Sequence, residues 1–381
     1  MKPIVLQQPP RIRFGASGVA QAMDEFALLG SRRVWVAAGK RSAAMGQPLF
    51  QRWRNAGLTV EIYDGIDREP DIAMFERALA AARAFGPDSV VGFGGGSPLD
   101  VAKLVAALLD GAQTVRDVFG IGRLSGRTAN LICIPTTAGT GSEVSPNAIL
   151  LDETERLKKG AVSPHLVPDV AILDPQLTVG VPPAVTAATG IDALVHCMEA
   201  FANRNAHPVV DVYALEGIRR ISRSIEAAVT NGADMQARTD VMLGALYGGL
   251  CLGPVNTAAV HALSYPLGGE YRVAHGVANS LLVPHVFRFN LPAMPERYAA
   301  IAQALGAGDA GSAAATAEAG LLRLEQLSRA CGIPAHLREF GIAAADLPRL
   351  AGEALKVTRL LTNNPRELTA ADAESIYRAA F

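Results

Sequence analysis

The chain carries almost no net charge and has few aromatic residues. Lysine and arginine total 35, aspartate and glutamate total 36, and only 6% of the residues are aromatic. No basic stretch interleaved with aromatic residues occurs along the chain. Nucleic acids and anionic membrane surfaces attract proteins through concentrated positive charge. We therefore expect neither of them as a partner.

Long apolar runs and paired cysteines are also missing. No window approaches about eighteen uninterrupted apolar residues, the minimum for a membrane-spanning helix. The first fifteen residues lack the apolar core of a signal peptide. The four cysteines are scattered and form no Cys-x-x-Cys pair, which argues against a zinc ribbon or a disulfide framework. These absences predict a cytoplasmic protein.

What the sequence does contain is two halves of different character. With 381 residues, half of them apolar, the chain is long for one core and predicts two domains. Between about residues 30 and 175, short apolar runs alternate with helical patterns, which is typical of a parallel sheet covered by helices. From about residue 180, Ala- and Leu-rich periodic segments predict helices only. We expect strands at 32–38, 88–94, 130–135 and 170–174, and helices at 72–85 and 98–110.

The expected fold is an α/β domain with a Rossmann-like parallel sheet, followed by an all-α domain. Turn residues cluster near Thr178–Pro183, which places the boundary there. The α/β domain is predicted to span residues 1–178 and to bind a dinucleotide. The helical domain is predicted to span residues 179–381.

A glycine-rich stretch, GFGGGSPLDVAK (92–103), lies between a predicted strand and a predicted helix. Three consecutive glycines let the backbone turn tightly and approach another group with no Cβ in the way. Their N–H groups, with Ser97 and the helix N-terminus, can bind an anion such as a pyrophosphate. The stretch matches neither the GxGxxG fingerprint nor a P-loop. Alone, such a stretch is more often a simple tight turn than a phosphate site.

A second polar stretch, PTTAGTGSEVS (135–145), also follows a predicted strand. It supplies several hydroxyl groups beside two glycines. Polar loops at the carboxyl ends of two parallel strands are what a nucleotide site needs. The alternative is a loop that caps a helix through Ser142. The presence of two such loops favours the nucleotide site.

One carboxylate and three imidazoles lie in largely apolar surroundings in the second half. In GIDALVHCMEAF (190–201), Asp192 and His196 are four residues apart and share one helix face. An Asp–His pair on a helix is commonly a surface or capping interaction. His261 and His275, in HALSYPLGGEYRVAHG (261–276), extend the set to four potential ligands. Such a set suits Fe(II), Zn(II) or a similar ion.

Together the four stretches resemble the iron-containing (group III) alcohol dehydrogenase family over nearly the whole length. The resemblance implies the architecture that this family shares with dehydroquinate synthase. It also implies a metal site formed by Asp192, His196, His261 and His275. The residues that it implies for cofactor binding are Gly39, Lys40, Gly94, Gly95, Gly96, Ser97, Asp100, Thr136, Thr137, Thr140, Ser142 and Lys158.

The resemblance further implies a reaction. A divalent metal, Fe(II) or alternatively Zn(II), would polarise a carbonyl or stabilise an alkoxide, and NADP(H) or NAD(H) would carry the hydride. The expected partners are a small alcohol or aldehyde and further copies of the chain, as a homodimer or larger homo-oligomer. The implied catalytic residues are His261, His275 and Tyr265. Many family members have a second histidine where this chain has Tyr265, which could relay a proton or simply form a pocket wall.

Cofactor choice is suggested by Gly39, at the end of the predicted strand 32–38. Many NAD-using relatives have an aspartate there, which would bond the ribose 2′-hydroxyl and repel a 2′-phosphate. Lys40, Arg41 and Ser42 follow directly. This pattern favours NADP(H) without excluding NAD(H). The alternative is that Lys40 and Arg41 belong to a solvated loop.

Three other functions are compatible with parts of the sequence. A maleylacetate-reductase-like enzyme would reduce an aromatic-degradation intermediate without metal, but such relatives are poorer in the full ligand set. A dehydroquinate-synthase-like lyase would need a cationic pocket for a phosphate-bearing substrate, and Lys356 is the only lysine after residue 179. A nucleotide-binding protein without catalysis leaves the four ligands unexplained.

Overall fold

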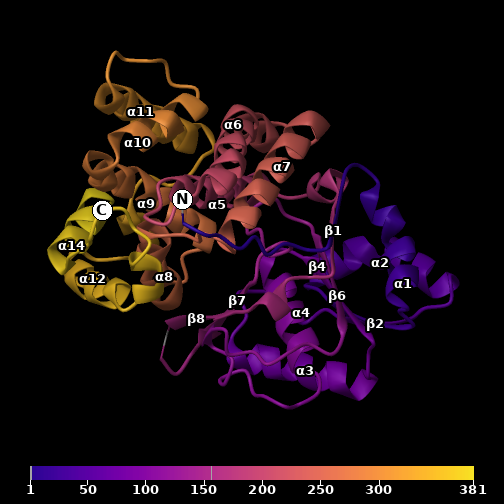
Figure 1. Cartoon of the computed structure of the whole chain (residues 1–381). Coiled ribbons are helices and arrows are strands. Elements are labelled where there is room, and N and C mark those ends of the chain that lie inside the picture. The colour runs from indigo at the N-terminus through magenta and orange to yellow at the C-terminus, as the bar shows by residue number, and fades with distance from the viewer. Residues whose placement is uncertain (1, 156) are drawn as a thin grey trace. The chain divides into compact units, whose positions relative to one another are not determined.

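A computed structural model describes residues 2–155 and 157–381 of the chain (Figure 1). The chain folds into two compact units. The α/β unit comprises residues 6–137 and 142–178. The helical unit comprises residues up to Val5, the short segment 138–141, and residues 179–381.

The α/β unit is built on a six-stranded parallel sheet with the strand order β1-β9-β6-β4-β2-β3. The strands are β1 (Arg11–Phe14), β2 (Arg33–Ala37), β3 (Thr59–Tyr63), β4 (Ser89–Gly94), β6 (Asn130–Pro135) and β9 (Val170–Leu173). The four strands expected from the sequence are confirmed. β1 and β3 were not anticipated because they are the two edge strands, which are only partly buried and lack a continuous apolar run.

Helices cover both faces of this sheet (Figure 1). Alternate residues of a strand point to opposite faces. In β2, Val34 and Val36 pack with α1 (Ala22–Leu29) and α2 (Lys40–Asn55), whereas Trp35 and Ala37 pack with α3 and α4. α3 (Ile72–Phe85) and α4 (Gly96–Leu108) lie where the sequence predicted helices.

A second, three-stranded sheet in the α/β unit was not predicted. Its order is β5-β8-β7, from β5 (Gly120–Ile121), β7 (Asn147–Asp152) and β8 (Leu157–Val162). β7 and β8 pair antiparallel, and side chains along β7 alternate between half-buried and buried. This alternation is typical of an antiparallel strand with one covered face, and a search for continuous apolar runs overlooks it.

The described residues from 179 onward contain helices and no strand. The helices are α5 (Pro183–Phe201), α6 (Pro208–Thr230), α7 (Met235–Leu252), α8 (Ala259–Tyr271), α9 (His275–Asn290), α10 (Pro295–Ala304), α11 (Ala313–Ala330), α12 (Leu347–Leu355), α13 (Thr358–Leu361) and α14 (Ala370–Ala379). α5 packs against α6, α7 and α9, and almost all of its residues after Val185 are buried. Within the described part of the chain, no helix is both long and apolar enough to span a membrane.

Candidate metal and nucleotide sites

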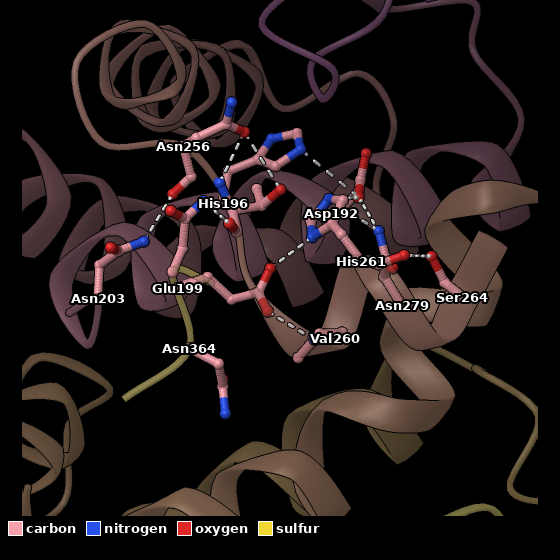
Figure 2. Close-up of polar contacts among 12 residues, drawn as sticks. Asp192, His196, Glu199, Asn203, Asn256, Val260, His261, Ser264, Asn279 and Asn364 are labelled. Atoms are coloured by element: carbon pink, nitrogen blue, oxygen red, sulfur yellow. Dashed lines mark hydrogen bonds and ion pairs between the residues drawn. The ribbon is translucent and has the colours of Figure 1, made fainter. Parts of the chain in front are cut away.

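Three helices of the helical unit bring the four expected ligands around one carboxylate oxygen. Figure 2 labels three of them, Asp192, His196 and His261. Asp192 and His196 come from α5, His261 from the first turn of α8, and His275 is the first residue of α9. The Oδ1 atom of Asp192 lies 3.9 Å from Nε2 of His196, 3.6 Å from Nε2 of His261 and 3.8 Å from Nε2 of His275. Asp192, His196 and His261 are buried, and His275 is partly exposed.

The four residues are not equally close to one another. Asp192, His261 and His275 each offer a ligand atom, and these atoms all lie within 4.8 Å of one another. His196 is not one of these three residues, but its ring contacts one of them. Its ring stacks on that of His261, with 4.8 Å between the ring centroids and 22° between the planes.

This donor set fits a divalent ion. Ligand atoms about 2.0–2.3 Å from a tetrahedral ion lie roughly 3.3–3.7 Å from one another, close to the separations seen here. The amide nitrogen of Asn279 lies 2.6 Å from the Asp192 Oδ1 atom, 3.1 Å from His261 Nε2 and 3.3 Å from His275 Nε2. A partly positive N–H group thus contacts the atoms that would bind a cation. The Oδ1 atom of Asn279 is buried and finds no hydrogen-bond partner among the described residues.

The charges of the cluster are strongly coupled. Burial alone would raise the pKa of Asp192, but the three neighbouring imidazoles outweigh burial and lower the pKa. Burial lowers the pKa of His196 to about 4. Burial also acts to lower the pKa of His261, but Glu199 and Asp192 together raise it to about 9. Asp192 is therefore ionised and His196 neutral near neutral pH, the forms in which each binds a metal, whereas His261 must lose a proton to bind one.

Glu199 and Asn279 complete the surroundings of the cluster, and the sequence analysis missed both. A signal was available for each. Glu199 follows Asp192 by seven residues and His196 by three, so all three share one face of a helix that is otherwise apolar. Asn279 follows His275 by four residues on α9. Both are polar residues in helical segments whose other buried residues are mostly apolar.

Tyr265 lies on α8, one turn after His261, and is 7% exposed. Its ring centroid is 6.2 Å from that of His275. Its apolar neighbours are Ala262, Val357 and Leu360.

In the α/β unit, the two polar loops begin side by side at the carboxyl ends of adjacent strands. Gly94, the last residue of β4, is paired with Pro135, the last residue of β6, and the Thr136 N–H donates to the Gly94 carbonyl at 2.8 Å. A Cβ atom added to Gly94 would lie 2.6 Å from Cγ of Pro98, so only glycine fits there. One added to Gly95 would lie 3.4 Å from Oγ1 of Thr137. The first loop therefore touches the second.

Four further predicted cofactor residues lie in the first turns of α4 or in the second loop. Gly96 and Ser97 open α4. The Ser142 hydroxyl donates to Asp100 at 2.5 Å, and the other Asp100 oxygen accepts the Ile149 N–H at 3.0 Å. Burial raises the pKa of Asp100 against the opposing charge of Lys103. These contacts hold the second loop in place.

Thr140 and Lys158 belong to two other segments of the chain. Thr140 belongs to the short segment 138–141, which is part of the helical unit. Lys158 lies on β8. Its side chain is 7% exposed, and its ammonium is 2.8 Å from Glu69. The structure thus pairs Lys158 with a carboxylate.

Gly39 and Lys40 open α2 directly after β2. A Cβ atom on Gly39 would lie 2.6 Å from the Ile66 carbonyl oxygen and 3.7 Å from Oδ1 of Asp67. The Lys40 N–H donates to Asp67 at 3.0 Å, and the Lys40 ammonium is 3.4 Å from the same carboxylate. The backbone hydrogen bond from Lys40 lowers the pKa of Asp67. A carboxylate from the loop after β3 thus lies beside Gly39.

Comparison with known proteins identifies the family. Residues 9–175 match the family described as iron-containing alcohol dehydrogenase, and residues 186–381 match the C-terminal part of the Fe-containing alcohol dehydrogenase family. Long-chain-alcohol dehydrogenase 1 of Geobacillus thermodenitrificans is 40% identical over 98% of this chain and 95% of its own. 1,3-Propanediol dehydrogenase of Klebsiella pneumoniae is 36% identical over 97% and 96%, and lactaldehyde reductase of Escherichia coli is 33% identical over 97% of each.

A solved structure of 1,3-propanediol oxidoreductase superimposes with a TM-score of 0.96 at 35% identity, covering 100% of both chains. The resemblance and the fold class inferred from the sequence are confirmed. The chain belongs to the iron-containing alcohol dehydrogenase family.

Proposed function

We propose that Asp192, His196, His261 and His275 together bind one divalent ion, Fe(II) or alternatively Zn(II), at which this oxidoreductase acts on a primary alcohol or its aldehyde. The family membership shows an alcohol dehydrogenase, and a relative described as an NAD-dependent methanol dehydrogenase supports NAD(H) as the cofactor. The observation that carries the proposal is that three imidazole Nε2 atoms lie within 3.9 Å of one buried carboxylate oxygen. Long-chain alcohols, 1,3-propanediol and lactaldehyde, named in the relatives, all have a terminal alcohol or aldehyde group.

A bound divalent ion would act as a Lewis acid on the carbonyl or alkoxide oxygen of the substrate, and NAD(H) would exchange the hydride with its carbon. The charge of the residues in the cluster favours binding of the ion. Ionised Asp192 supplies a full negative charge at a buried position, which favours a cation over water. The proton-relay role predicted for Tyr265 and its alternative role as a pocket wall both stay predictions.

The proposal is tested with metal-free protein. We expect no turnover of primary alcohols or aldehydes with NAD(H) until Fe(II) or Zn(II) is restored. His261→Ala and His275→Ala should each lose the bound metal. The matched control is His336→Ala, which removes a histidine of the same unit outside the cluster. Full turnover by protein shown to be metal-free would instead support the metal-independent, maleylacetate-reductase-like alternative.

The choice between NAD(H) and NADP(H) depends on a carboxylate outside the metal cluster, that of Asp67. Rossmann-type sites select NAD through an acidic residue at the carboxyl end of the strand beside the glycine loop, where it bonds the ribose 2′-hydroxyl. β2 is the strand beside β4, and Asp67 lies against its end at Gly39. We propose that Asp67 takes this role and that the enzyme prefers NAD(H). Asp67 therefore argues against the NADP(H) preference inferred from Gly39 and Lys40.

Asp67→Ser should raise kcat/KM for NADPH relative to NADH at least about tenfold, because the carboxylate that repels the 2′-phosphate is gone. Asp64→Ser removes a nearby exposed carboxylate and should leave the ratio unchanged. A wild-type enzyme that already prefers NADPH would refute the role of Asp67. The homo-oligomeric assembly, implied by the family resemblance, and the cytoplasmic location, inferred from the sequence, stay predictions.

A further inference from the structure

Glu199 makes two short contacts with consecutive residues at the start of α8 (Figure 2). Its Oε2 atom lies 2.6 Å from Nδ1 of His261, and its Oε1 atom accepts the Val260 N–H at 2.6 Å. The side chain comes from α5 and is 7% exposed. One carboxylate thus contacts both the ring of a proposed ligand and the backbone beside it.

We propose that Glu199 is the positioning residue that fixes the tautomer and the orientation of His261 so that its Nε2 atom is available to the metal. This inference rests on the proposed metal site. An ionised carboxylate can only accept hydrogen bonds, so the Nδ1 atom that faces it must carry the hydrogen. When a metal displaces the other ring proton, the lone pair that it binds is therefore the one on Nε2, which is the ring nitrogen that faces Asp192.

The second contact explains why α8 begins where it does. Val260 is in the first turn of α8, where backbone N–H groups have no partner within the helix. The N-cap position is Ala258, whose side chain cannot accept a hydrogen bond. The Oε1 atom of Glu199 accepts from this turn instead, and its negative charge suits a helix N-terminus. Glu199 therefore holds the backbone and the ring of His261 together.

The way in which the buried charge of Glu199 is compensated also links this residue to the metal cluster. A buried carboxylate is stable only when a positive charge or several donors compensate it. Among the described residues, no lysine or arginine is paired with Glu199, and its ion-pair partner is His261. The Glu199 carboxylate is therefore separated from the proposed metal-binding atoms only by the imidazole ring of His261.

Glu199→Gln tests this role with almost no change of volume. The amide has one accepting oxygen and one donating nitrogen. If the oxygen keeps the Val260 N–H, the nitrogen faces Nδ1 and drives the ring hydrogen to Nε2, where it blocks the metal. Turned the other way, the amide opposes the Val260 N–H with its own donor. Loss of such an outer carboxylate typically weakens metal binding about 10- to 100-fold.

The measurement is the dissociation constant of Zn(II), by competition with a chromophoric chelator, without cofactor or substrate. The control is Asp240→Asn, which changes a buried carboxylate of the same unit that is paired with Arg220 and Arg223. We expect weaker zinc binding in Glu199→Gln and wild-type zinc affinity in Asp240→Asn. Wild-type zinc affinity in Glu199→Gln would overturn the inference.

A second measurement reads the tautomer in the wild-type protein and uses a variant only to assign the signal. In zinc-loaded protein with ¹⁵N-labelled histidine, the ring signal lost in His261→Ala should show a hydrogen on Nδ1 and the metal on Nε2. The opposite tautomer would overturn the role of Glu199 while leaving the proposed function intact. Wild-type protein that binds neither zinc nor Fe(II) would overturn the proposed metal site, and the inference with it.

Discussion

The contact between α9 and α5 at Gly276 provides a sharp test of how the metal ligands are held. Gly276 follows His275 directly, and Ala188 lies four residues before Asp192 on α5. A Cβ atom on Gly276 would lie 2.2 Å from the Ala188 carbonyl oxygen and 2.7 Å from its carbonyl carbon. Both are backbone atoms, which no side-chain rotation can move away. Gly276→Ala must therefore separate the helix that carries His275 from the helix that carries Asp192.

The size of the effect follows from the distance. Restoring ordinary van der Waals contact requires a shift of about 1 Å, and ligands of a metal site must be held within about 0.5 Å of their productive positions. We expect Gly276→Ala to weaken zinc binding at least about tenfold and to lower kcat/KM about 100-fold. Overpacking should also cost roughly 1–3 kcal/mol of stability. Zinc affinity, NADH-linked turnover and thermal unfolding measure the three quantities.

Gly352→Ala is the matched control. Gly352 is an exposed residue of α12, and an added Cβ atom there would meet no atom within 4 Å. The change should stabilise the protein by about 0.5–1 kcal/mol, because alanine loses less conformational freedom in a helix than glycine does. Metal binding and turnover should not change. If Gly276→Ala binds zinc and turns over like this control, close contact with α5 does not set the position of His275.

Two further predictions concern the α/β unit. Burial raises the pKa of Glu143 from 4.5 to about 7, so ionisation at higher pH works against the folded state. Glu143→Gln should therefore gain up to about 3 kcal/mol over wild type at pH 8 and lose this advantage at pH 4, as urea unfolding at the two pH values would show. Gly94→Ala should weaken NADH binding at least about tenfold in a fluorescence titration, because its Cβ atom would lie 2.6 Å from Cγ of Pro98 and distort the glycine loop.

The sequence predicted the centre of the fold better than its edges. β4 and β6 are buried along almost their whole length, so each shows a continuous apolar run that can be recognised without any partner strand. β1 and β3 each have one unpaired edge and mixed composition, so their strand character depends on the neighbour they pair with. Prediction failed where structure is decided by pairing.

The same division holds for the candidate sites. The spacing of Asp192 and His196 within one helix is a local property that the sequence displays. The hydrogen bond from the Lys40 N–H to Asp67, and the contact of Glu199 with His261, join residues that lie 27 and 62 positions apart. Such contacts depend on how strands and helices cross, which local periodicity does not encode. For this reason the sequence alone does not reveal the carboxylate beside Gly39, on which the proposed preference for NAD(H) rests.

One stripe of α5 connects these observations. Ala188, Asp192, His196 and Glu199 follow one another at intervals of four, four and three residues, so they lie along a single helix face. The first touches Gly276 beside His275, the next two are proposed ligands, and the last touches His261. α8 and α9 are thus each attached to this stripe by a contact at or next to the histidine they supply. Because one rigid, buried helix sets the positions of all four proposed ligands, their geometry follows from helix packing. The site is therefore held in place by the same contacts that stabilise the core of the helical unit.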